Sequence, residues 1–290
     1  MRLSGRRSSS NVEDRRGMST GAKAGLGGLG GIIVIALMTF MSGGNLGDVV
    51  NNVVQQQMQA PTQTVGEENF TEEEQELAEE CKQILASTED VWTKVFEENG
   101  WGKYEYPTLV LFTNQVNSAC GSASAAVGPF YCSGDQKLYV DLSFFTEMKR
   151  QLGVEGNTFA YAYVLAHEIG HHVEYLTGTL NKAHQAMSQT NKVQANQISV
   201  RLELLADYYA GVWAHYEDQM YHSMEYGDLE KGLELAKAIG DDWLQRKAQG
   251  RATPESFTHG TSDQRKRWLK RGYETGNMNT TTFTGSYEDL

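Results

Sequence analysis

Two histidines stand four residues apart in an otherwise apolar stretch of this 290-residue chain. His167 and His171 point the same way if the stretch is helical, because residues four apart share one helix face. Residues 159–166, directly before them, are apolar apart from two tyrosine hydroxyls, so we expect a buried helix. Buried histidines need polar partners. A shared metal ion meets that need, whereas the alternative, an ordinary helix with two surface histidines, fits the apolar context poorly.

Glu168 completes a His-Glu-x-x-His pattern across residues 167–171. The pattern is typical of zinc peptidases, in which two imidazoles hold Zn²⁺ and the glutamate acts as general base on a water in the open metal position. Zinc lowers the pKa of that water and polarises the scissile carbonyl. We therefore predict one Zn²⁺ ion, with His167 and His171 as metal ligands and Glu168 as a catalytic residue.

A third ligand has to come from elsewhere, because a catalytic zinc ion usually has three protein ligands. The metzincin continuation would place glycine at 174 and histidine at 177, but the chain has Glu174 and Thr177, which excludes that class. Farther along, Glu203 and Asp207 lie one helical turn apart among apolar residues. We predict Glu203 as the third metal ligand and Asp207 as the acceptor for an N–H of a ligating histidine.

Other interpretations of the acidic residues stay open at this stage. The two acids of the second helix could instead form a buried salt bridge to Arg201 or Arg265. Glu174, three residues after His171, is another candidate ligand, although we expect it near the rim of the site. His172 is turned by about 100° from the ligand face and is the weakest candidate.

Peptide hydrolysis also needs a donor that stabilises the oxyanion of the tetrahedral intermediate. We predict His259, which lies just before the last expected helix, as a second catalytic residue. Tyr208, Tyr209 and Arg265 are alternatives for the same role. A purely structural histidine is the simpler explanation of His259.

The Glu-x-x-x-Asp helix that follows the histidine motif resembles the gluzincin arrangement. Over nearly its whole length the chain also resembles the bacterial neutral zinc metallopeptidase family. The segments that carry this resemblance are Gly5-Arg6-Arg7, Asn11-Val12-Glu13-Asp14-Arg15-Arg16, Gly128-Pro129-Phe130-Tyr131-Cys132, the motif at 167–172, Glu203-Leu204-Leu205-Ala206-Asp207, and His259-Gly260-Thr261-Ser262 with Gln264-Arg265. The resemblance implies a zincin-like fold and peptidase activity.

The charge is unevenly distributed along the chain. Residues 1–23 contain six basic and two acidic residues, whereas the whole chain has a net charge of −12. An uncharged, glycine-rich and apolar run follows, and we predict a transmembrane anchor at 24–43. The head at 1–23 would then be cytoplasmic and the acidic body periplasmic or extracellular, as in a single-pass membrane protein. A cleaved secretory signal peptide is the alternative.

The remaining pattern predicts an α+β, mainly helical fold with a small β-sheet after the anchor. We expect a flexible linker at 44–70, a zincin-like catalytic domain at 71–277 and a loose tail at 278–290. Strands are predicted at 108–112 and 137–141, and helices at 72–98, 158–176, 192–217, 228–249 and 262–272. 

The chain has three cysteines, at positions 81, 120 and 132. Cys120 and Cys132 flank a loop rich in glycine, serine and alanine, and we predict that they form a disulfide. Cys81 falls on the apolar stripe of a helix and is expected to be a buried thiol.

The sequence thus predicts a membrane-anchored zinc metallopeptidase that hydrolyses a peptide or protein substrate. The acidic balance argues against a nucleic-acid partner, and no oligomeric state follows from the sequence. The alternative function is a zinc-stabilised, non-catalytic binding or scaffold domain at the membrane surface. A water beside Glu168 on an open metal position would favour the enzyme, and a fourth protein ligand would favour the scaffold.

Overall fold

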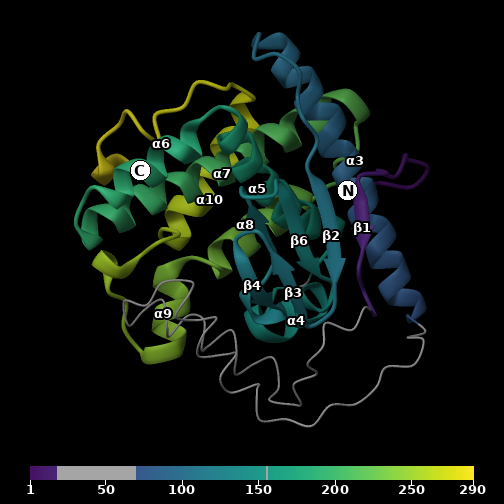
Figure 1. Cartoon of the computed structure of the whole chain (residues 1–290), viewed down its shortest axis with the longest axis horizontal. Coiled ribbons are helices and arrows are strands. Elements are labelled where there is room, and N and C mark those ends of the chain that lie inside the picture. Colours follow the sequence, from purple (N-terminus) through teal and green to yellow (C-terminus); the bar gives the residue numbers. More distant parts are fainter. Residues whose placement is uncertain (18–69, 155) are drawn as a thin grey trace.

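The computed structural model describes residues 1–17, 70–154 and 156–290. Within them the fold is mainly helical, as predicted, and it has two small sheets where one was expected (Figure 1). The strands are β1 (Val12–Asp14), β2 (Thr108–Phe112), β3 (Gln115–Ser118), β4 (Gly121–Ser124), β5 (Phe130–Cys132) and β6 (Lys137–Asp141). The helices are α3 (Glu72–Glu98), α4 (Ser143–Leu152), α5 (Thr158–Leu176), α6 (Thr179–Ser188), α7 (Lys192–Tyr221), α8 (Asp228–Ala238), α9 (Asp241–Gln249) and α10 (Ser262–Thr275).

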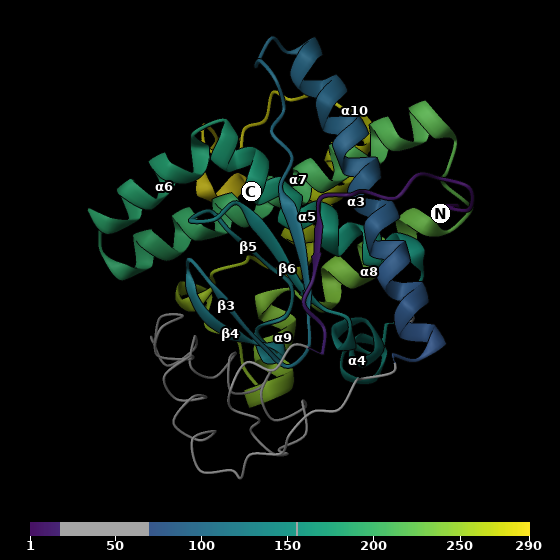
Figure 2. The ribbon, with the colours of Figure 1, turned by 45° about the vertical axis from the view of Figure 1, so that its right-hand side comes forward.

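The larger sheet has the strand order β1-β2-β6-β5. β1 and β6 both run parallel to β2, whereas β5 runs antiparallel to β6 and forms an edge of the sheet. β3 and β4 pair separately as a hairpin. Figure 2 shows α3 lying beside β1 and β2. The same helix also packs against α5 and α7. β5 is the strand that packs against α5.

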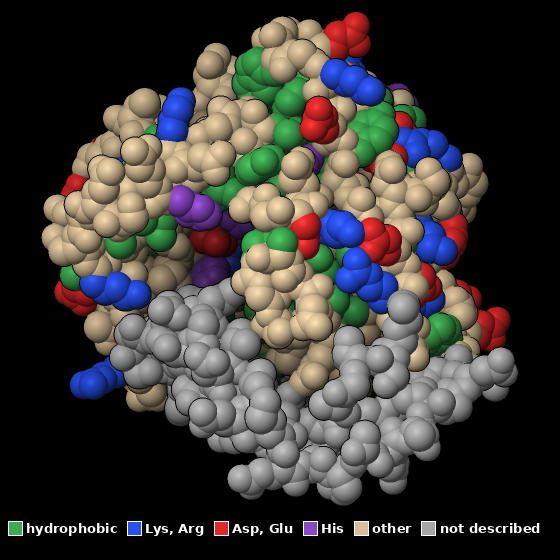
Figure 3. Space-filling view, in the orientation of Figure 1, with side chains coloured by type: hydrophobic (Ala, Val, Ile, Leu, Met, Phe, Trp, Pro, Cys, Tyr) green, Lys and Arg blue, Asp and Glu red, His purple; other side chains and the backbone are tan. Residues whose placement is uncertain are grey.

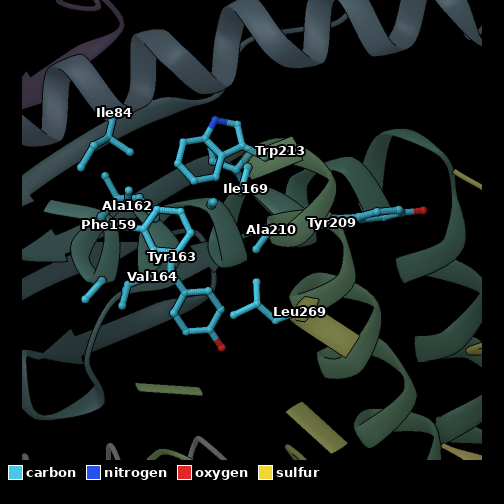
Figure 4. Close-up of a cluster of buried hydrophobic side chains, with 14 of the residues drawn as sticks. Ile84, Phe159, Ala162, Tyr163, Val164, Ile169, Tyr209, Ala210, Trp213 and Leu269 are labelled. Atoms are coloured by element: carbon cyan, nitrogen blue, oxygen red, sulfur yellow. The ribbon is translucent and has the colours of Figure 1, made fainter. Parts of the chain in front are cut away.

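Helices α5 and α7 cross in the core, and α10 packs along α7. Small residues permit these close approaches, because a Cβ atom built on Gly170 would lie 2.9 Å from the Cα atom of Ala206. At the second crossing, a Cβ atom on Gly211 would overlap the carbonyl oxygen of Leu269. Figure 4 shows the apolar side chains that fill the space around these helices, among them Tyr163, Trp213 and Leu269.

The helices of the structure differ from the prediction in two respects. The segment 228–249 is not one helix but two, α8 and α9, which are separated at Ile239 and Gly240. The backbone of Gly240 is pressed against Ser262, since a Cβ atom there would lie 2.5 Å from the Cα atom of Ser262. The short helices α4 and α6 were not predicted.

The predicted single-pass membrane topology is wrong. No helix in residues 1–17, 70–154 and 156–290 is long and apolar enough to cross a bilayer. The predicted anchor at 24–43 and the linker up to residue 69 lie outside the described residues.

The described part of the basic head is built into the same domain as the acidic body. β1 extends the sheet by pairing with β2. Arg6 Nη1 lies 2.5 Å from Glu217 Oε1 on α7, and the Glu217 side chain is fully buried. Ser9 Oγ donates to the buried carboxylate of Glu89 on α3 at 2.5 Å. Head and body therefore do not lie on opposite sides of a membrane, which corrects the predicted localisation.

The structure also defines the pairing of the cysteines and the position of the C-terminal tail. Cys120 and Cys132 form a disulfide, and Cys81 is a buried free thiol, both as predicted. The tail at 278–290, which we expected to be loose, contacts α7: Arg201 donates to the carbonyl oxygens of Thr282 and Gly285.

Candidate metal centre

Helix α5 carries the histidine motif on one face, as the sequence predicts. The helix begins where the side chain of Asn157 accepts a hydrogen bond from the N–H of Ala160. Its apolar residues pack into the core, whereas the side chains of His167 and His171 are only 9% and 15% exposed. The helix therefore presents two nearly buried imidazoles in one direction.

Glu203 of α7 meets these imidazoles. His167 Nε2 lies 3.2 Å from Glu203 Oε2, and His171 Nε2 lies 3.6 Å from Glu203 Oε1. The three residues each offer a ligand atom within 4.8 Å of the others. Two imidazole nitrogens and one carboxylate form a donor set that suits a catalytic zinc ion. The structure thus brings together the three predicted metal ligands.

Asp207 lies behind His167, one turn along α7 from Glu203. Its Oδ1 atom lies 2.8 Å from His167 Nδ1 and accepts a hydrogen bond from the Tyr163 hydroxyl at 2.7 Å. Arg265 of α10 donates through Nε to Asp207 Oδ2 at 2.8 Å. Because Asp207 can only accept when ionised, His167 holds its proton on Nδ1 and presents Nε2 to the metal side. The salt bridge considered as an alternative does exist, but it joins Arg265 to Asp207.

Electrostatics in this network favour a cation. Burial raises the pKa of Asp207, but the charges of Arg265 and His167 outweigh burial and lower it to about 2. Burial lowers the pKa of His167, but the charge of Asp207 and the hydrogen bonds to Asp207 and Glu203 together outweigh burial and raise it to about 10. In the metal-free protein His167 would therefore hold a second proton on Nε2, facing Glu203. A metal ion can replace that proton.

Glu174 lies deeper in the protein than its sequence position predicts. We expected it near the rim, but its side chain is 0% exposed, and Oε2 lies 2.8 Å from His171 Nδ1. Burial raises the pKa of this carboxyl group to about 7, although His171 opposes the shift. The sequence contains enough information to predict the contact between Glu174 and His171, because a residue three positions after a histidine lies beside it on the helix surface.

Glu168 lies between the candidate ligands and the edge of the sheet. The backbone of Tyr131 in β5 lies close enough to lower the pKa of the Glu168 carboxyl group. Burial raises the pKa of Glu168, while the neighbouring charges of His167 and His171 lower it. Glu168 is not one of the three converging ligands. It is therefore placed to exchange protons beside them.

His172 does not point at the ligand group. Its Nε2 atom donates to the carbonyl oxygen of Glu105 at 2.7 Å, and its Nδ1 atom accepts from the Tyr131 hydroxyl at 2.9 Å. Burial lowers the pKa of His172 to about 4, so the ring is neutral. His172 thus anchors Tyr131, and with it β5, to α5.

His259 lies close enough to Glu203 for their charges to interact. Asp241 fixes the loop that carries it: Asp241 Oδ2 accepts the backbone N–H groups of Thr258, His259 and Gly260. Asp241 Oδ1 also lies 3.2 Å from His259 Nδ1. The His259 side chain is 43% exposed, so it can reach a bound molecule.

The other oxyanion candidates are held in different contacts. The Tyr208 hydroxyl donates to the carbonyl oxygen of Asn277 at 2.6 Å. Tyr209 is buried and packs edge-on against Trp92. Arg265 is engaged with Asp207. Among the four residues considered, His259 alone combines exposure with proximity to the ligand group.

Comparison with known proteins agrees with the metal-site motif. The family described as "Putative neutral zinc metallopeptidase" matches residues 1–283. The chain belongs to this family. The chain is similar to "Uncharacterized protein YpfJ" from Escherichia coli K12, to which it is 43% identical over 282 residues, covering 95% of this chain and 96% of the relative. "Uncharacterized protein Rv2575" from Mycobacterium tuberculosis H37Rv is 42% identical over 185 residues, 61% of each chain. No solved structure matches significantly.

Proposed function

We propose that this member of the neutral zinc metallopeptidase family is an active zinc-dependent peptidase with a zincin-like catalytic domain of gluzincin type. The observation that carries the proposal is the convergence of His167, His171 and Glu203 beside Glu168. His167 and His171 would hold zinc through Nε2, and Glu203 through its carboxylate. Zinc, when bound there, supplies a Lewis acid that polarises a peptide carbonyl and acidifies water.

The chain's own residues would then carry the proton transfers. Glu168 takes a proton from the water that attacks the peptide carbonyl and passes it to the nitrogen of the leaving amine. Its desolvation supports this role, because burial raises the pKa of the carboxyl group toward the working pH. His259, held through Nδ1 by Asp241, would offer a donor to the developing oxyanion.

The edge strand β5 would position the substrate. β5 pairs with β6 on one side only and lies beside α5. An extended peptide could add to such an edge through main-chain hydrogen bonds. The backbone of Tyr131 in this strand lies close enough to the proposed base, Glu168, to lower its pKa. The substrate class proposed is therefore an extended, unfolded peptide segment.

A closed zinc site in a scaffold protein is the competing function. It would need a fourth protein ligand, and within the described ranges the group contains three residues. The side chain of Glu203 is 17% exposed, so solvent reaches the centre. Figure 3 shows histidine and acidic side chains in a hollow on one face of the molecule. These observations favour the enzyme.

The test is hydrolysis of an unfolded protein by the full chain, with and without a metal chelator. Chelation should abolish hydrolysis and added Zn²⁺ should restore it. Glu168→Gln should bind zinc as the unmodified chain does and lose hydrolysis, since the amide cannot accept the proton. Glu234→Gln, which changes an exposed acid on α8, is the matched control and should keep full activity. Turnover retained by Glu168→Gln would refute the mechanism.

A further inference from the structure

Each metal-side imidazole is backed by one buried carboxylate. Asp207 accepts from His167 Nδ1 at 2.8 Å, and Glu174 lies at the same 2.8 Å from His171 Nδ1. Both acids are 0% exposed. The two contacts leave both Nε2 atoms facing Glu203.

The two carboxylates differ in how they are held. Asp207 is tied by Tyr163 and by both Nε and Nη2 of Arg265. Among the described residues, the carboxylate of Glu174 has one hydrogen-bonding partner, His171, and its second oxygen, Oε1, is buried without one. Folding therefore gains little from Glu174, because burying a half-satisfied carboxylate costs free energy.

The contact between Glu174 and His171 lies within a single helix, α5. Asp207 reaches His167 from another helix, so that contact depends on how α5 and α7 pack. Glu174 lies three residues after His171 on α5, and side chains at this spacing meet on the helix surface. The contact that orients the His171 ring is thus made within α5 and does not depend on how α5 and α7 pack.

We propose that Glu174 is a positioning residue for the metal centre: it fixes the His171 ring with the proton on Nδ1, so that Nε2 is presented to the metal. The inference rests on the proposed zinc site, but it does not require the chain to be an active peptidase. Outer carboxylates that hold ligating histidines in this way raise metal affinity by about 10- to 100-fold.

The experiment is a zinc competition assay on the full chain with a chromophoric chelator. Glu174→Leu removes the acceptor, and zinc affinity should fall by about 10- to 100-fold. Glu174→Gln keeps a side-chain oxygen of the same reach, and its affinity should lie between those of Glu174→Leu and the unmodified chain. The same variants are unfolded in urea with excess chelator. There, Glu174→Leu should match or exceed the stability of the unmodified chain, since an apolar residue replaces a half-satisfied acid.

Glu217→Leu is the matched control. Glu217 is another fully buried acid, paired with Arg6 and Ser87 outside the metal centre. This variant should lose stability while its zinc affinity stays unchanged, which is the opposite pattern. Zinc affinity of Glu174→Leu within twofold of the unmodified chain would overturn the inference.

The remaining outcomes separate this inference from the proposed function. If the unmodified chain binds zinc, and Glu174→Leu binds it more weakly, but no substrate is cleaved, the peptidase proposal fails and the positioning role stands. If the unmodified chain does not bind zinc, the metal centre itself is refuted, and the role of Glu174 falls with it.

Discussion

Replacing Gly170 by alanine should disturb the metal centre without touching a ligand. Gly170 lies inside the histidine motif, where α5 crosses α7. An alanine Cβ atom would lie 2.9 Å from both the Cα and the carbonyl oxygen of Ala206, and 3.2 Å from its Cβ atom. Two of these contacts are with backbone, so no flexible side chain can yield.

The size of the effect follows from those distances. Relief of a 2.9 Å contact to about 3.4 Å requires the helices to separate by about 0.5 Å, whereas a metal site tolerates about 0.2 Å in its ligand distances. Overpacking costs about 1–3 kcal/mol, partly offset by about 1 kcal/mol of better helix propensity. We expect a net loss of up to about 2 kcal/mol and a fall in Tm of up to roughly 8 °C.

Zinc affinity should fall as well, because Glu203 on α7 moves relative to the histidines on α5. We expect a loss comparable with that of an outer hydrogen-bonding partner, about 10- to 100-fold. Thermal unfolding in chelator and zinc competition with a chromophoric chelator measure the two effects separately.

Gly232→Ala on α8 is the control for overpacking alone. Its Cβ atom would lie 2.6 Å from Cε1 of Phe159, at the start of α5 and two turns from His167. This variant should be destabilised while its zinc affinity stays the same. Unchanged stability and zinc affinity in Gly170→Ala would refute the idea that the close approach of α5 and α7 sets the metal geometry.

Three further substitutions test other parts of the structure. Asp207→Asn leaves a buried guanidinium on α10 without its carboxylate and should lower the unfolding free energy in chelator by about 3–5 kcal/mol; an unchanged urea midpoint would contradict this network. Serine at both Cys120 and Cys132 removes a link that spans 12 residues and should cost about 3 kcal/mol by loop closure, a difference that should vanish when both proteins are unfolded in reductant. Arg6→Ala leaves Glu217 buried without its cation and should cost about 3–5 kcal/mol in the same urea assay; full stability would mean that residues 1–17 do not dock on the body.

Much of this protein follows from local sequence. The apolar run at 159–166 predicts α5, and the helix predicted at 72–98 is α3, which begins at a capping box formed by Thr71 and Glu74. The His-Glu-x-x-His spacing places His167 and His171 on one helix face. Each of these inferences needs only neighbouring residues, because helix caps and helix faces are set by positions within one or two turns.

The errors come from contacts that neighbours cannot reveal. The basic head suggested a separate cytoplasmic segment, yet Arg6 pairs with Glu217, 211 residues later. The break between α8 and α9 occurs where Gly240 meets Ser262. Both outcomes depend on which surfaces meet after the chain folds.

The metal centre combines both kinds of information. The sequence alone indicates which side chains could bind a metal, and the spacing of two of them. Only the tertiary structure decides that Glu203 meets His167 and His171. It also decides that Arg265 forms an ion pair with Asp207, and that Glu174 is buried behind His171. The physical reason is that a ligand set is a matter of distances between helices, and those distances are set by how closely residues such as Gly170 and Ala206 let the helices approach.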